Sequence, residues 1–274
     1  MLFSAIGYSQ SAWVKSKGEL YSQLSYNDIS NYKRLFNKNG RDLFTSRFIS
    51  DRTIQLYGEY GFTNKLTIVS AIPIKALKAG KIVSEYSSLP TINEGSLIAL
   101  GNIDFGVRYL LLRKKVNLTT QVQIGFPTSS YDSNTGLRSG INSFVVNPSI
   151  SIGKGRGNWF LQGSVGLLLR TNNYSNAAKI YAEGGRKFFD HLWAIAFVDI
   201  VDSFEDGDLV ESPENIETFL NLNNSEYTGY GMKLIVEVND KFGLTAAFGG
   251  AFSAHLEAKK ASYNFGVYYK FKKI

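Results

Sequence analysis

Cysteine is absent from this chain of 274 residues, and histidine and methionine occur only twice each. Without cysteine the chain can form no disulfide, no thiolate metal site and no thiol redox motif. No run approaches the roughly 20 consecutive apolar residues that a membrane-spanning helix requires. The net charge is +7, but the Lys and Arg residues are scattered and form no long basic run. Nucleic acid is therefore not expected as a partner.

Signals for catalysis are equally poor. His191 lies in a short turn and His255 in a long loop, so on the topology developed below they lie at opposite ends of the molecule. A hydrolase would need a serine beside a histidine, and only Ser253 or Ser262 with His255 offers this. The segment "GKGRGN" lacks the Gly-Lys-Ser/Thr ending of a P-loop. We expect neither an enzyme nor a cofactor.

What the chain does have is aromatic residues, 14% of the total, together with 26 glycines. Polar and apolar residues alternate along the whole chain with a period of two, which is typical of β-strands with one apolar face. The segment "SYNFGVYYKF" shows the pattern, because Phe265, Val267 and Tyr269 share a face. About twelve such segments are predicted, at 18–27, 52–62, 66–74, 101–112, 116–126, 144–153, 158–170, 177–188, 192–201, 227–238, 242–252 and 262–274.

The connections between these segments alternate in length. Short connections are expected at 63–65, 113–115, 154–157, 189–191 and 239–241, and long ones at 28–50, 75–99, 127–143, 171–176, 202–226 and 253–261. An even number of strands with short turns at one end and long loops at the other is typical of bacterial outer-membrane barrels. In lipid every backbone amide must be paired, so only a closed sheet can span the membrane. We predict a single closed, antiparallel transmembrane β-barrel in the bacterial outer membrane, with short periplasmic turns, long extracellular loops and both termini periplasmic.

The polar face of each strand would line the lumen of this barrel. The candidate selectivity residues there are Glu19, Glu59, Asp104, Arg108, Gln121, Gln123, Arg170, Lys179, Glu183, Lys187, Lys233, Glu237 and Lys270. Charged rings can choose among solutes in an open pore. The same charges could instead pair across a narrow interior and fill it, and a barrel of this size lies between the filled and the water-filled types.

Aromatic side chains near the strand ends would form interfacial belts. The inner belt, near the short turns, is predicted to comprise Phe62, Trp159, Phe189, Trp193, Phe242, Tyr269 and Phe271. The outer belt is predicted to comprise Phe126, Phe144, Tyr227, Phe252 and Tyr263.

The two ends of the barrel carry further candidate features. The first residues, "MLFSAIGYSQ", are apolar and carry no Lys or Arg, so residues 1–10 read as a signal-peptide remnant, or as a frayed tail, before a barrel domain at 11–274. A weak calcium candidate lies in the acidic loop, at Asp202, Glu205, Asp206, Asp208 and Glu211, although a solvated loop is the simpler interpretation. Basic residues in the first two long loops, including Lys33, Arg34, Lys78 and Lys81, could face phosphates of the outer leaflet.

Three stretches, "YGEYGFTNKLTIVSAIPI" (57–74), "GNIDFGVRYLLL" (101–112) and "VQIGFPT" (122–128), carry a resemblance. They resemble the outer-membrane β-barrel family named after the meta-pathway of phenol degradation, through Glu59-Tyr60-Gly61 and Pro127-Thr128. The family's Gly-Asp pair is interrupted here as Gly101-Asn102-Ile103-Asp104. The sequence match covers roughly residues 50–130. Elsewhere the resemblance is one of architecture only. It implies a channel or transporter for small, often hydrophobic molecules. The closing aromatic strand likewise resembles the assembly signal read by the barrel-insertion machinery.

The function expected from these observations is passage of a small-molecule solute, with selectivity from the mixed-charge lumen and from loops 28–50, 75–99 and 202–226 acting as lids. The alternative is a barrel with a filled lumen that serves as an accessory subunit of a larger outer-membrane complex. Outer-membrane lipid and, in the alternative, a protein partner are the other expected contacts.

Overall fold

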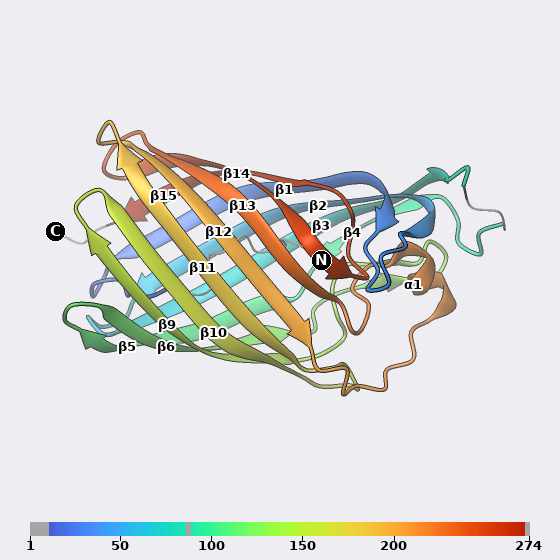
Figure 1. The fold of residues 1–274 in the computed structure, drawn as a ribbon, viewed down its shortest axis with the longest axis horizontal. Helices are drawn as coiled ribbons and strands as arrows, with labels where there is room; N and C mark the ends of the chain where they lie inside the picture. The colour runs from blue at the N-terminus through green and yellow to red at the C-terminus, as the bar shows by residue number, and fades with distance from the viewer. Residues whose placement is uncertain (1–10, 86–88, 272–274) are drawn as a thin grey trace.

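The computed structural model describes residues 11–85 and 89–271, and the predicted signal remnant lies outside these ranges. Twelve antiparallel strands form the wall: β1 (Leu20–Leu35), β2 (Leu43–Gly61), β3 (Leu66–Ile82), β5 (Ile103–Arg113), β6 (Asn117–Phe126), β9 (Val145–Arg156), β10 (Trp159–Arg170), β11 (Ala177–Phe188), β12 (Leu192–Ser203), β13 (Glu226–Glu237), β14 (Phe242–His255) and β15 (Ser262–Phe271). The sheet closes because β1 pairs with both β2 and β15. The predicted closed barrel is confirmed (Figure 1).

The extra strand β4 (Gly95–Leu100) precedes β5 in the chain, and both strands pair with β3. Ile74–Ala79 of β3 pairs with β4, and Leu66–Ala71 of β3 pairs with β5. The break between them is bridged by Asn102, whose side-chain amide donates to the carbonyls of Phe126 and Ile141, at 3.0 and 2.8 Å. Asn102 thus fills the gap that the interrupted ladder leaves.

The strand register puts apolar side chains outside and polar side chains inside. Antiparallel partners lie on the same face of a sheet, as in the pairs Leu24–Val267 and Tyr26–Phe265 between β1 and β15. These four side chains are all exposed on the outer wall, whereas Gln23 on the opposite face is 1% exposed. Because this apolar outer surface encircles a closed sheet, the wall has the character that a lipid bilayer requires.

The ends of the barrel differ as predicted, with short turns at one end and long connections at the other. The short turns lie at the left of Figure 1, and the long connections and the helix α1 (Pro213–Thr218) lie at the right. No helix in the described part of the chain is long and apolar enough to cross a membrane.

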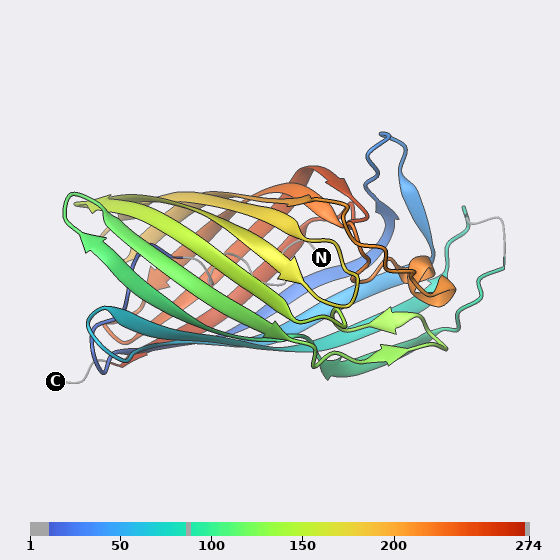
Figure 2. The ribbon, with the colours of Figure 1, turned by 90° about the horizontal axis from the view of Figure 1, so that it is seen from below.

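Two of the predicted long loops are wrong in extent. Residues 28–50 are mostly strand, since β1 runs to Leu35 and β2 starts at Leu43. In the predicted loop 75–99, all of 75–82 belongs to a strand, because β3 ends at Ile82. The period of two fails there because the β1–β2 ladder contains register shifts after Ile29 and again after Tyr32. The first three strands therefore extend beyond the others at the loop end (Figure 2).

The outer end of the lumen is capped by packed side chains. The short hairpin of β7 (Tyr131–Asp132) and β8 (Leu137–Arg138) and the segment after α1 pack against the inner wall of β1–β4. The cluster contains Ile29, Tyr32, Leu35, Ile49, Leu77, Ala79, Leu137 and Leu220, all nearly inaccessible to solvent. All three segments predicted to act as lids contribute residues to this cluster: Ile29 and Ile49 come from 28–50, Leu77 and Ala79 from 75–99, and Leu220 from 202–226.

Candidate functional site: the barrel lumen

The lumen contains two cavities in sequence along the barrel axis. The inner cavity, about 450 Å³, lies at the short-turn end, and the outer cavity, about 270 Å³, lies below the cap. Of the predicted lumen residues, Glu59, Glu183, Lys233, Glu237 and Lys270 line the inner cavity, and Asp104, Gln123, Arg170 and Lys179 line the outer one. Lys187 joins Glu237 and Lys270 at the inner mouth, and Arg108 and Gln121 are buried in the wall between.

Residues 11–17 do not continue the wall but fold back into the lumen. At the short-turn rim, the backbone N–H of Lys17 donates to the Asn64 side chain at 3.0 Å. Further in, the backbone N–H of Lys15 donates to Thr67 Oγ1 at 2.8 Å. The predicted lumen residue Glu19 accepts from the backbone N–H of Ser16 and holds the reversal of the chain. We call residues 11–17 the lumen segment.

The lumen segment then crosses toward the opposite wall. Arg108 donates to the backbone carbonyl of Trp13 at 3.0 Å, Thr119 donates to that of Ser11 at 2.9 Å, and the N–H of Ala12 donates to Gln162 at 3.0 Å. Ala12 is completely buried. This placement could not be predicted from the sequence, because the segment has no period of two and its backbone is satisfied by side chains of four different strands, β3, β5, β6 and β10.

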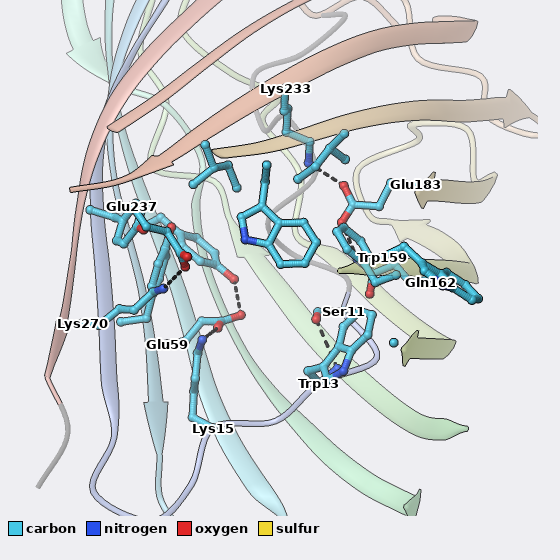
Figure 3. A pocket seen from close by; sticks show the side chains of 18 of the residues that line it. Ser11, Trp13, Lys15, Glu59, Trp159, Gln162, Glu183, Lys233, Glu237 and Lys270 are labelled. Atoms are coloured by element: carbon cyan, nitrogen blue, oxygen red, sulfur yellow. Dashed lines mark hydrogen bonds and ion pairs between the residues drawn. The ribbon is translucent and has the colours of Figure 1, made fainter. Parts of the chain in front are cut away.

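The inner cavity has aromatic walls beside charged groups. The Phe160 ring lies edge-on between the rings of Trp13, at 5.7 Å, and Trp193, at 5.5 Å. Tyr21 and Tyr268 stack on the other side at 5.4 Å. Figure 3 shows the lumen-segment residues Trp13 and Lys15 projecting into the same space as Glu59, Glu237 and Lys270. The cavity therefore offers broad apolar surfaces with charges at their edges.

Packed side chains separate the two cavities, and one group of them stands on β11–β13. Lys233 lies 2.7 Å from a Glu183 carboxylate oxygen and donates to the Tyr181 hydroxyl at 3.0 Å. Its ammonium also lies over the rings of Tyr181 and Phe197, which stack on each other. Each of these four side chains is at most 8% exposed. We call this group the β11–β13 partition.

A second buried group fills the facing wall. Arg108, which is 0% exposed, contacts Glu59 at 2.8 Å and donates to Gln121 at 2.9 Å. Tyr57 donates to the same Glu59 carboxylate, and Lys15 of the lumen segment lies 3.1 Å from its other oxygen. Glu59 is thus the point where the lumen segment and the barrel wall share an ion pair.

Pairing of this kind extends through the lumen. Asp51 pairs with Lys75 at 2.9 Å, Asp199 with Lys179 at 3.7 Å, and Glu237 with Lys187 at 2.6 Å and Lys270 at 3.2 Å. Most inward-facing acidic groups therefore have a basic partner within 4 Å, so neighbouring fields largely cancel. The lumen has mixed charge without a continuous stripe of one sign.

Most members of the predicted inner belt lie near the short turns with exposed rings. Phe62, Trp159, Phe189, Phe242 and Phe271 are exposed there, and Tyr269 packs on Phe242 at 4.9 Å. Trp193 is a correction, because it faces the inner cavity. The register pairs Phe197 with the inward Glu183, so the odd-numbered residues of β12 point inward and small alanines face lipid.

Tyr227 of the predicted outer belt is a similar correction. It points into the outer cavity, where its hydroxyl donates to Asp199 at 3.1 Å. β12 carries apolar residues on both faces, so hydrophobicity alone could not assign its orientation. On β13, Tyr227 shares a face with Lys233 and Glu237, both predicted for the lumen, so the alternation itself puts Tyr227 inside. The pairing of β11 with β12 across the short turn 189–191, together with the polar face of β11, contained the missing information.

The acidic loop has its carboxylates in separate contacts. Glu205 pairs with Lys38, Asp206 accepts from the Asn176 side chain at 2.6 Å, and Glu211 lies 3.5 Å from Arg138. Among the described residues no group of three or more His, Asp or Glu side chains is placed to hold a metal ion. The hydrogen bond from Lys38 lowers the pKa of Glu205, and that from Asn176 lowers the pKa of Asp206.

No family model matches the chain, and no curated protein matches it. Among solved structures it is similar to the COG4313 outer membrane channel from Pseudomonas putida F1, with 14% identity over 95% of this chain and 98% of that chain and a TM-score of 0.69. The KdgM porin, solved with disordered oligogalacturonate, shares 7% identity over 91% and 99%, with a TM-score of 0.50. The β domain of the Bordetella autotransporter BrkA shares 11% over 93% and 100%, with a TM-score of 0.51.

Identities this low show a shared fold, and the resemblance to the phenol meta-pathway family stays a prediction. The fold nevertheless indicates where in the cell the protein lies. A closed barrel with an apolar outer wall, short turns at one end and long loops at the other is the architecture of outer-membrane channels and porins. This chain is accordingly a β-barrel protein of the bacterial outer membrane.

Proposed function

We propose that the barrel is a channel for small molecules, and that the lumen segment is its gate on the periplasmic side. The observation that carries this proposal is the inner cavity, since Ser11, Trp13 and Lys15 of the lumen segment line it (Figure 3). The fold shared with outer-membrane channels and porins supports the same class of function.

The contacts that hold the lumen segment are of a kind that can break without unfolding the barrel. Its backbone is held by side-chain hydrogen bonds to Thr67, Arg108, Thr119 and Gln162 and not by a strand ladder. A hydrogen bond of this kind contributes about 0.5–1.5 kcal/mol. Ala12 is the fully buried residue of the segment, and the contact of the Trp13 ring with Phe160 and the Lys15–Glu59 ion pair are the further interactions that release must break. Such a segment can leave the lumen while the closed sheet remains intact.

The proposed selectivity follows from the paired lumen charges and the aromatic walls. Pairs such as Glu183–Lys233 and Glu237–Lys187 leave no single-sign ring of the kind that selects ions. We infer that uncharged molecules with an apolar portion pass in preference to ions, and that the external loops limit access from outside. Lys233, Glu183 and Arg108 are the residues expected to set the narrowest section.

Single-channel recording in planar bilayers tests the proposal. The intact protein should show small conductance steps, and a variant that lacks residues 1–17 should show steps several-fold larger. Liposome swelling with neutral solutes should rise in parallel. A matched control, Lys17→Ala with the segment retained, should behave like the intact protein. Equal conductance of the intact and shortened proteins would contradict the gate.

A specific observation favours the alternative, a filled barrel that serves as an accessory subunit. The β11–β13 partition and the Glu59–Arg108 group together pack the section between the two cavities. If both the intact and the shortened protein are silent in bilayers and a stoichiometric partner co-purifies, the accessory role replaces the channel.

Catalysis is not part of the proposal. His191 lies in the turn before β12 and His255 at the outer end of β14, so the two histidines stand at opposite ends of the barrel. Recognition of the terminal aromatic strand β15 by the barrel-insertion machinery remains our expectation for assembly.

A further inference from the structure

The outer wall of β1–β3 differs from the rest of the lipid-facing surface at the loop end. On β6, β9, β13 and β14 the outward residues there are aromatic or aliphatic, for example Phe126, Tyr230 and Phe252. On β2 and β3 the outward positions at the same end include Arg52, Lys78 and Lys81, all exposed. One sector of the wall is therefore basic where the others are apolar.

This basic sector contains a hollow that the strand irregularities create. Asn31 has a left-handed backbone, with φ of 55°, at the register shift of β1, and its N–H donates to Ser50 Oγ at 3.0 Å. A further shift falls between Arg47 and Ile49 of β2. Such bulges twist and bend a strand locally. The resulting cavity of about 330 Å³ is lined by Asn31, Phe48, Ser50, Lys78, Gly80, Lys81 and Glu94. We call it the outer-wall hollow.

The charge of the hollow is positive where a ligand would meet it. Within the described residues, neither the Lys78 nor the Lys81 ammonium group has an ion-pair or hydrogen-bond partner, and Glu94 is the acidic residue of the lining. Nearby charges are already engaged, since Arg52 pairs with Asp28 at 3.2 Å and Lys33 pairs with Glu85. Two ammonium groups thus stand beside the polar groups of Asn31 and Ser50 with one carboxylate to offset them.

The height of the hollow matches a lipid headgroup. Lys78 follows the first residue of β3, Leu66, by 12 positions. With a rise of about 3.3 Å per residue and a strand tilt of about 40°, Lys78 lies roughly 30 Å along the barrel axis. The apolar band of such barrels is about 25 Å tall. Lys78 therefore lies just beyond the hydrocarbon, and Ala76 paired with the exposed Ile98 provides apolar wall beneath it.

We propose that the outer-wall hollow binds the phosphorylated sugar headgroup of a glycolipid of the outer leaflet, of the lipid A type. Lys78 and Lys81 bind the phosphate, the exposed side-chain amide of Asn31, which Ser50 holds in place, donates to the sugar, and the acyl chains lie along Ala76 and Ile98. The site is on the outside of the barrel and is independent of whether the lumen conducts.

Native mass spectrometry of the folded protein in detergent, titrated with diphosphorylated lipid A, tests the site. The double variant Lys78→Ala/Lys81→Ala should bind about 30-fold more weakly, because each lysine near a lipid surface contributes roughly 5-fold. The matched control Lys114→Ala/Lys115→Ala removes two exposed lysines from the turn at the other end and should bind like the intact protein. Replacement of Lys78 and Lys81 by Arg should restore binding.

Three further results decide the identity of the ligand. Lipid A without its phosphates should bind as weakly as the double variant does, and an unchanged affinity would overturn the proposal. Inorganic phosphate at millimolar concentration should leave lipid binding intact, and full competition would replace the lipid by free phosphate. Equal binding of lipid A to the double variant and to the intact protein, with the heat-modifiable gel shift of both preserved, would also overturn the site.

Discussion

The two ends of the lumen are closed by different physical means. At the outer end, Leu137 and Leu220 are buried in an apolar cluster with the inner wall of β1–β4. At the inner end, residues 11–17 are held through their backbone by side chains such as Thr67 and Arg108. Burial of a leucine contributes about 1.5–3 kcal/mol, and a hydrogen bond about 1. The outer closure is therefore the more stable, and the inner closure is the one suited to open.

The largest expected effect is at Glu59, where the inner closure meets the wall. Glu59→Ala leaves the buried Arg108 without its carboxylate and releases Lys15. Removal of one partner of a buried pair costs about 3–5 kcal/mol. The free energy of unfolding in urea should fall by this amount, and the channel conductance should rise.

The double variant Glu59→Ala/Arg108→Met supplies the control, because it removes both charges and should recover much of the lost stability. The single variant should also shift the selectivity between anions and cations. A loss below about 1 kcal/mol, with selectivity unchanged, would mean that Glu59 neither stabilises the wall nor faces a conducting path.

The outer closure should respond to a smaller change in its core. Leu220→Ala removes a side chain that is 1% exposed and should destabilise the cap by about 2–4 kcal/mol. Limited digestion with a glutamyl endopeptidase, which cleaves after residues such as Glu211 and Glu214, should then cut the loop 204–225 faster, while the strands stay protected. Val210→Ala, in the same loop but 90% exposed, should digest like the intact protein. Equal rates for the two variants would show that the cluster does not hold the loop.

The orientation of β12 in the wall decides whether Trp193 points into the inner cavity or toward lipid. Ala196 is exposed on the lipid side and lies between the inward residues Ile195 and Phe197. Ala196→Lys places a charge in hydrocarbon and should cost about 2–4 kcal/mol near the midplane. Folding into bilayers from urea measures this, with Ala196→Leu as the neutral control. Full tolerance of the lysine would reverse the orientation of β12.

The smallest expected effect is pH dependence at the outer rim. Glu205 has a lowered pKa because Lys38 donates a hydrogen bond to it, and the same bond raises the pKa of Lys38. A lowered carboxyl pKa stabilises the folded form at a pH above the pKa of the unfolded chain, about 4.3. This stabilisation is lost as the pH falls through the lowered pKa of the folded form. Protease resistance of the rim loops should therefore be flat near neutral pH and weaken in acid. In Glu205→Gln the acid-induced change should be smaller.

The sequence allowed the barrel itself to be predicted, since a period of two and alternating connection lengths are local signals. It did not reveal where three parts of the molecule lie. β12 carries apolar residues on both faces, so Trp193 was assigned to lipid. Tyr227 was assigned to lipid for its aromatic ring, although it shares the face of Lys233 and Glu237 on β13. The bulges near Asn31 hid the extension of β1 and β2. The lumen segment has no strand pattern, and its position depends on side chains far away in the chain, such as Gln162.

One measurement tests the gate most directly, because the chain has no cysteine of its own. A Cβ added at Gly153 would lie 2.6 Å from the Cβ of Ala12, and a small outward shift gives the 3.5–4.5 Å of a disulfide. In the variant Ala12→Cys/Gly153→Cys, oxidation should tether the lumen segment and suppress conductance, and reduction should restore conductance. In either single variant, conductance should be the same under oxidising and reducing conditions. Conductance that is the same in the oxidised and reduced double variant would contradict a gate formed by residues 11–17.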